Sequence, residues 1–77
     1  MIIVPGQEGI VVSIARVSIH GEEYVDVVVA DSDAPDDPAS RLTARLGPEG
    51  IVGDIVPGDR VRIEGFLRMV TRLEKID

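Results

Sequence analysis

The stretch that most constrains the fold is VPGDRVRIEGFLRM, residues 56–69. Its Pro57-Gly58 pair is typical of a tight turn. After the turn, Val61 and Ile63 alternate with polar residues, as in a strand that buries one face. Gly65 then interrupts the alternation and allows the strand to bend. A turn, a two-faced strand and a bend in this order predict part of a small, curved β-sheet.

Four further segments have strand composition, and none shows a long helical pattern. HGEE, residues 20–23, is a polar turn with a glycine, and it predicts a hairpin between the first and second strands of the chain. The other expected strands are residues 9–19, 24–30 and 41–46, and a last one near residues 71–76. Alternation within the strands predicts inward positions at Val25, Val27, Val29, Leu42, Ala44, Leu46, Val61 and Ile63.

The first strand changes phase along its length. Ile10, Val12 and Ile14 share one face, and the apolar set then switches to Val17 and Ile19. Such a switch within one strand is typical of a β-bulge or a sharp coil.

Two segments are expected outside the strands. DSDAPDDPAS, residues 31–40, contains turn-forming residues throughout and predicts a loop, with Asp capping and Pro stiffening. GPEGIVGDI, residues 47–55, places Pro48 at a possible first helical position and Glu49 in the first turn. Its glycines limit the expected helix to one or two turns.

With 77 residues, the chain is expected to form a single domain, residues 1–77, with a small core. The order strand, strand, strand, short helix, strand, strand predicts an all-β fold. The expected architecture is a five-stranded Greek-key barrel with a short helix between strands 3 and 4.

The composition argues against most catalytic chemistry. The chain has no cysteine and one histidine, which removes a disulfide framework and makes a zinc site improbable. His20 lies in a polar turn and lacks a nucleophile pattern, and no phosphate-binding glycine motif occurs. The acidic loop lacks the Gly and Glu positions of a calcium-binding loop. We expect neither an enzyme nor a bound metal or cofactor.

No apolar run reaches the length of a membrane span, and the N-terminal residues do not resemble a signal peptide. We therefore expect a cytoplasmic protein without membrane contact. The net charge is −6. Residues 1–40 carry one arginine against eight acids, whereas residues 41–77 carry seven basic and six acidic groups. The acidic balance argues against strong non-specific binding to nucleic acid, although a local basic face can still exist.

GIVVSI, VVVADSD and IVPGDRVRIEGFL together resemble the OB-fold domains of replication protein A, single-strand-binding proteins and the anticodon-binding type. This resemblance spans nearly the whole chain. It implies a binding module for single-stranded DNA or RNA, held on the outer face of the first three strands and by the loops between strands 1–2 and 4–5. Cations along the groove would neutralise phosphates and flat side chains would stack on bases. The candidate contacts are Arg16, Tyr24, Arg41, Thr43, Arg45, Phe66, Arg68 and Arg72.

A second resemblance is to small HypC-type hydrogenase maturation chaperones, carried by IVPGQ and GDRVRIEGF. The working residue of that family is a cysteine directly after the initiator Met, where this chain has Ile2. The second resemblance therefore extends to the barrel only.

The alternative function is a protein–protein adaptor or a self-assembling barrel. The net acidic charge, the scarcity of aromatic residues and the valine-rich strands favour it. Exposed strand edges can pair with another chain. In that case Val11 and Val28 are expected on the outer face, within an interface.

Overall fold

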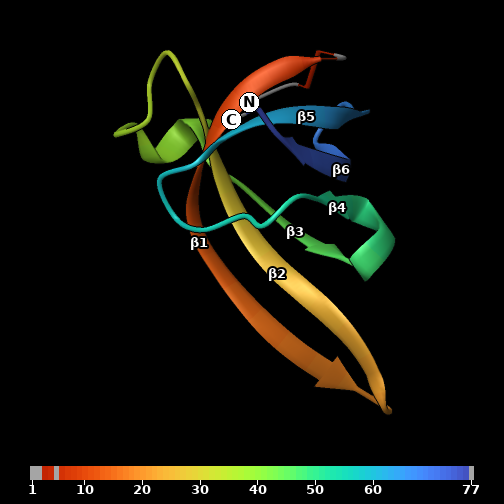
Figure 1. The fold of residues 1–77 in the computed structure, drawn as a ribbon. Coiled ribbons are helices and arrows are strands. Elements are labelled where there is room, and N and C mark those ends of the chain that lie inside the picture. Colours follow the sequence, from red (N-terminus) through yellow and green to blue (C-terminus); the bar gives the residue numbers. More distant parts are fainter. Residues whose placement is uncertain (1–2, 5, 77) are drawn as a thin grey trace.

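The computed structural model describes residues 3–4 and 6–76 and is all-β, as the alternating patterns predict. Six strands form one mixed sheet in the order β3-β2-β1-β5-β6-β4 (Figure 1). They are β1 (Gln7–Ile19), β2 (Glu22–Asp31), β3 (Leu42–Leu46), β4 (Ile51–Val52), β5 (Arg60–Phe66) and β6 (Met69–Lys75).

The sheet has one strand more than the sequence predicts. The addition is β4, which pairs in parallel with β6 through Ile51 and Leu73. In the described part of the chain, β3 and β4 are the two edges of the sheet, and no strand ladder joins them. β3 nevertheless lies in contact with β6, so the sheet is rolled.

The helix expected after the third strand is a single 3-10 turn, η2 (Pro48–Gly50), with Pro48 in its first turn and Gly47 before it. A second 3-10 turn, η1 (Pro38–Ser40), lies in the segment predicted as a loop. The Asp37 carboxylate caps it by accepting from the Ala39 amide at 2.9 Å, which agrees with the expected Asp capping.

The core fills the inside of the rolled sheet. Val61 and Ile63 of β5 are fully buried, and Val27 and Val29 of β2 are nearly so, as the alternation predicts. Val25 and Ala44 are partly buried and pack against this cluster. The other buried members are Ile3, Val11, Leu42, Leu46, Ile55, Val70 and Leu73.

A β-bulge interrupts β1 at Val12. The register with β2 shifts between Val11 and Ser13, which confirms the irregularity expected from the change of phase. The predicted common face of Ile10, Val12 and Ile14 is wrong, because the bulge at Val12 reverses the direction of the side chains that follow it. Val11, which was expected on the outer face, is buried in the core. After the bulge, Ile14 takes over the inward direction and packs against the core.

The Pro57-Gly58 turn forms as predicted and is tied to the bulge region. The Asp59 amide donates to the Val56 carbonyl at 3.1 Å, and Gly58 has the positive φ of 96° that this kind of turn requires. The Gly58 amide donates to the Val11 carbonyl at 2.8 Å, and the Val11 amide donates to the Asp59 carbonyl at 3.0 Å. The start of β5 is therefore fastened to β1 directly before the bulge.

Beyond the bulge, β1 pairs only with β2, and residues 13–25 form a hairpin arm. Val25, at the base of the arm, still pairs with Leu46 of β3, and the tip extends away from the rest of the sheet (Figure 1). The arm contributes to the molecule's longest dimension of 37 Å, against 25 and 21 Å in the other two directions. Its tip is a two-residue turn in which His20 and Gly21 have φ of 52° and 81°. This geometry suits the twist of a tight hairpin and confirms the predicted turn.

The bend expected at Gly65 coincides with a shift in the β5–β6 register between Glu64 and Gly65. A Cβ atom at this position would lie 2.1 Å from the Met69 carbonyl oxygen, so the backbone would have to move.

We expect Gly65→Ala to lower the free energy of unfolding by about 3 kcal/mol, measured by urea denaturation. Gly58→Ala is the control: its Cβ would meet nothing within 4 Å, so only the positive φ is penalised, by about 1 kcal/mol. Equal losses in the two variants would contradict the packing argument.

Candidate binding groove

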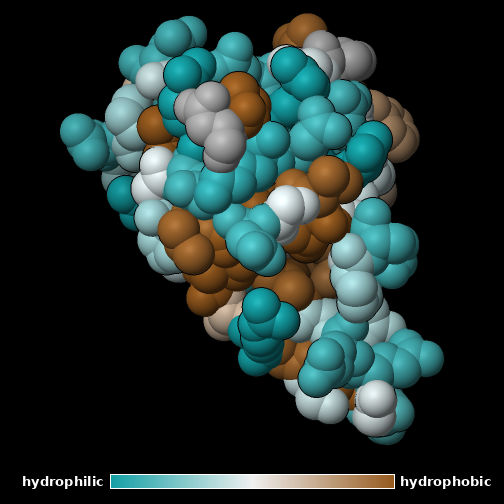
Figure 2. Space-filling view, viewed as in Figure 1, coloured by the Kyte–Doolittle hydropathy of each residue, from teal (hydrophilic) through white to brown (hydrophobic). Residues whose placement is uncertain are grey.

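A groove of about 460 Å³ lies between the hairpin arm and the segment that follows β3. Ile14 and Val25 line it from the arm, and Ile55 and Val56 line it from the connection between β4 and β5. Figure 2 shows apolar surface gathered where the arm leaves the body of the molecule. The polar side chains of the lining belong to Arg16, Glu23, Tyr24 and Asp54. The lining is therefore mixed, and a concave surface that combines apolar side chains with polar groups is a usual setting of a binding site.

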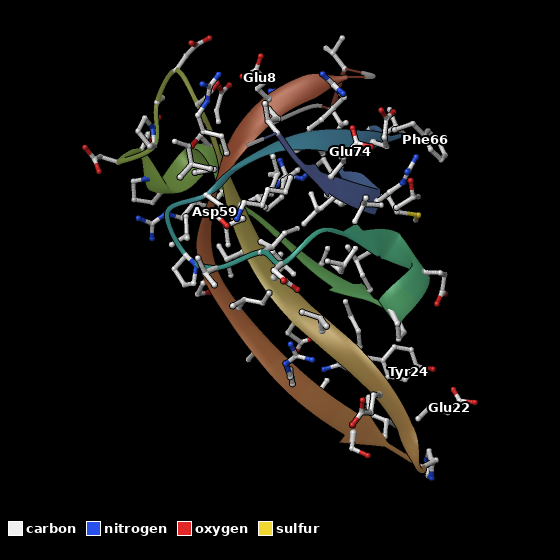
Figure 3. All side chains as sticks on the ribbon, viewed as in Figure 1. Glu8, Glu22, Tyr24, Asp59, Phe66 and Glu74 are labelled. Atoms are coloured by element: carbon white, nitrogen blue, oxygen red, sulfur yellow. The ribbon has the colours of Figure 1, made fainter. Side chains whose placement is uncertain are left out.

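Acidic side chains surround the end of the groove nearest the arm tip. A smaller hollow of about 320 Å³ shares Glu23, Tyr24 and Pro48 with the groove and adds Glu22 and Glu49. The Tyr24 hydroxyl donates to a carboxylate oxygen of Glu22 at 2.7 Å (Figure 3). This hydrogen bond, together with the charges of Glu22 and Glu49, raises the pKa of Tyr24. The groove therefore runs from an apolar part to an acidic part.

Arg45, a predicted phosphate contact, forms a bidentate ion pair. Its Nε donates to Asp26 Oδ1 at 2.8 Å and its Nη2 donates to Oδ2 at 3.0 Å. The two residues lie directly opposite each other on β3 and β2. The hydrogen bonds from Arg45 lower the pKa of Asp26, and those to Asp26 raise the pKa of Arg45. A phosphate at this position would have to compete with a carboxylate.

Arg72 has a carboxylate neighbour as well. Its guanidinium lies 3.6 Å from Glu74, which also accepts a hydrogen bond from Arg62 at 2.9 Å. Arg60 pairs with Glu8 across β5 and β1. Acids therefore interrupt the basic face that the arginine positions predict.

The remaining predicted cations are separate from one another. Arg16 lines the groove, Arg41 follows η1 and Arg68 lies in the turn between β5 and β6. Within residues 3–4 and 6–76, none of the three has a carboxylate oxygen within 4.0 Å. Thr43 is exposed on β3. Of the eight predicted contacts, the fold brings Arg16 and Tyr24 together in the groove.

The two aromatic rings do not share a surface. Tyr24 lies on the arm, whereas Phe66 lies at the β5–β6 turn, far from it (Figure 3). Phe66 is 62 % exposed, and its neighbours Leu67 and Met69 are 64 % and 62 % exposed, so the turn presents an apolar tip. Of the three residues expected to flank the connection between the last two strands, Phe66 ends β5, Arg68 lies within the connection and Arg72 lies in β6. The two rings are therefore too far apart to stack on neighbouring bases.

The groove-lining residues Ile14, Val25, Ile55 and Val56 are absent from the sequence-based candidates. They come from separate segments, and apolar residues in strands predict core as readily as surface. The exposure of Leu67 could have been predicted, because this residue lies in a two-residue connection between strands, where an apolar side chain has little core to pack against.

No helix in the described residues is long and apolar enough to cross a membrane. The same residues hold no group of three or more His, Asp or Glu side chains placed to bind a metal ion. The position that carries the chaperone cysteine, Ile2, lies outside the described residues. Comparison of the chain with protein-family models, curated proteins and solved structures gives no match.

Removal of the Arg45 side chain should raise the pKa of Asp26 toward the ordinary range, because its main stabilising partner is lost. A carboxyl group with a lowered pKa in the folded state stabilises the protein above its unfolded-state pKa. This contribution is lost as the pH falls through the folded-state value. Arg45→Ala should therefore shift the Asp26 midpoint upward in a carbon-13 NMR titration.

Asp59 serves as the internal control in the same titration. Its pKa is lowered by the Val56 amide and by Lys75, neither of which involves Arg45, so its midpoint should stay in place. An unchanged Asp26 midpoint would show that the ion pair does not form in solution.

Proposed function

We propose that this chain is a protein-binding module and that the groove receives part of its partner. The observation that carries the proposal is the apolar lining formed by Ile14, Val25, Ile55 and Val56 between two segments of the chain. An apolar concave surface is better suited to apolar side chains of a protein than to a phosphate backbone.

The charge distribution favours the same partner class. Binding of single-stranded nucleic acid depends on a continuous cationic path. Arg45 and Arg72 each have a carboxylate neighbour, the chain as a whole carries −6, and acids surround the arm end of the groove. A nucleic acid would meet repulsion at the surface where an apolar or basic peptide would be attracted.

For the architecture, we propose an OB-type barrel with a broken third strand. If β3 and β4 are counted as the two halves of one strand interrupted by η2, the chain has five strands, and the short turn lies within the third strand instead of between the third and the fourth. The parallel pairing of β4 with β6 and the contact between β3 and β6 support this interpretation. The fold type by itself does not specify a ligand, because this barrel carries many roles.

Single-stranded nucleic acid is the second candidate partner. One observation favours it: Arg16 and Tyr24 line the same groove, so a guanidinium and a ring could face one base.

The proposed protein-binding function is tested by selecting binders from a displayed library of random nine-residue peptides. The affinity of the recovered peptides is then measured by fluorescence anisotropy. We expect Val56→Glu to weaken their binding at least ten-fold, because it places a charge in the apolar part of the groove. Val52→Glu is the matched control, because Val52 is also exposed but does not line the groove. Failure to recover any peptide that binds at tens of micromolar would contradict the proposal.

Labelled oligo-dT, titrated at about 50 mM and at moderate salt, tests the second candidate. Binding that weakens with salt, and that falls in the Arg16→Ala variant, would favour nucleic acid over protein. Light scattering after size exclusion tests self-assembly. Of the two valines expected in such an interface, Val28 is half-buried, whereas Val11 belongs to the core.

A further inference from the structure

One long strand edge of the molecule has no partner. On the side away from β2, β1 pairs with β5 from Gln7 to Ile10, and the last bonds on this side join Val11 to the 56–59 turn. Among the described residues, no strand or backbone group pairs with residues 13–19 of β1 on that side. This edge is seven residues long and contains no proline or lysine, two of the features that usually protect an edge.

The hairpin geometry determines which backbone groups face outward. In a two-residue hairpin the residues that flank the turn, here Ile19 and Glu22, exchange hydrogen bonds, and bonded and non-bonded pairs alternate from there. Ile14, Arg16 and Ser18 occupy non-bonded pairs, so their amide and carbonyl groups point away from β2. Three donors and three acceptors are thus arranged for an added strand.

Two of these three residues line the groove, and the third lies beside its acidic end. Ile14 packs against the core and lines the groove, and Arg16 lines it one pleat further along. Ser18 lies directly opposite Glu23, which is at the acidic end. Because the serine side chain is short, a long basic side chain beside it could reach the Glu23 carboxylate.

Building on the proposed function, we infer that residues 13–19 of β1 bind an extended segment of the partner protein by β-strand addition. The segment places an apolar side chain beside Ile14, an acidic side chain beside Arg16 and a basic side chain beside Ser18 and Glu23. Main-chain hydrogen bonds supply affinity, and the alternating side chains supply specificity.

Charge complementarity favours a partner segment over a second copy of this chain. In an antiparallel dimer, residues 13–19 of one copy would pair with the same residues of a second copy. Arg16 would then lie directly opposite Arg16 of the other copy. Like charges in opposite positions of a sheet are destabilising. The segment described above instead matches the apolar, basic and acidic positions one by one.

The test uses peptides recovered from the random nine-residue library and measures their binding to the full chain. Recovered sequences should be enriched in alternating basic, acidic and apolar residues. Ser18→Pro removes an outward amide without removing a β1–β2 hydrogen bond, so it should weaken binding at least ten-fold. Ser18→Ala retains the amide and should bind within two-fold of the natural chain.

Peptide N-methylation tests the same contact without altering the protein. Methylation of the alternate amides that face β1 should abolish binding, whereas methylation of the intervening amides should have little effect. A thermal unfolding curve of Ser18→Pro shows whether its loss of binding comes from unfolding. If that variant is unfolded, the methylated peptides decide the outcome.

Three outcomes are distinguishable. Sensitivity to the alternate methyl groups, with enrichment of the charge pattern, supports strand addition. Peptides that bind with equal affinity after either methylation, yet are lost in Val56→Glu, overturn the edge inference and leave the protein-binding proposal in place. Recovery of no binding peptide overturns both.

Discussion

The bulge at Val12 is the constraint on which the arrangement of this molecule depends. β1 is the only strand that connects β2 and β3 to β5, β6 and β4 in the described sheet. Before the bulge, Val11 is buried and its backbone bonds the 56–59 turn, which fastens the start of β5. After the bulge, Ile14 takes the inward direction, and the far edge of β1 has no strand to pair with. A single inserted residue therefore separates a packed body from a free arm, and both the groove and the uncovered edge follow from it.

The charged side chains of this sheet pair mainly with oppositely charged side chains on neighbouring strands. Asp26 and Arg45 are paired because β2 and β3 place them opposite each other, and Arg62 reaches Glu74 in the same way across β5 and β6. These pairs are solvent-exposed, so each contributes little to stability. Their main consequence is for binding, because a paired guanidinium is less available to a phosphate. The acidic residues near the arm tip lie around Tyr24 and create the opposite preference, for a basic group.

The alternating patterns predicted the strands well, because period-two burial is a local property of each segment. The expected inward residues of the second, third and fourth predicted strands, which are β2, β3 and β5 of the structure, are buried or pack against the core. Two features were missed for physical reasons. β4 has only two residues, and its parallel partner lies more than twenty residues away, so local alternation cannot reveal it. The side of the sheet on which Val12 lies depends on the position of the bulge, because a shift of one residue reverses the direction of every side chain that follows. The site was predicted less well, since Arg45 and Arg72 were assigned as nucleic-acid contacts although each has a carboxylate beside it, Asp26 on the neighbouring strand and Glu74 two residues along β6.

The sequence by itself determined the all-β class, the turns at residues 20–21 and 57–58, and the interruption at Gly65. Each depends on residues adjacent in the chain: a glycine with a positive φ or no room for a Cβ atom, and side chains that alternate between two environments. Only the tertiary structure decided which surface is available for binding. The groove requires the arm to lie beside the connection between β4 and β5, and the edge of β1 is uncovered because β5 leaves it at the bulge. Both depend on contacts between segments far apart in sequence, which no local pattern encodes.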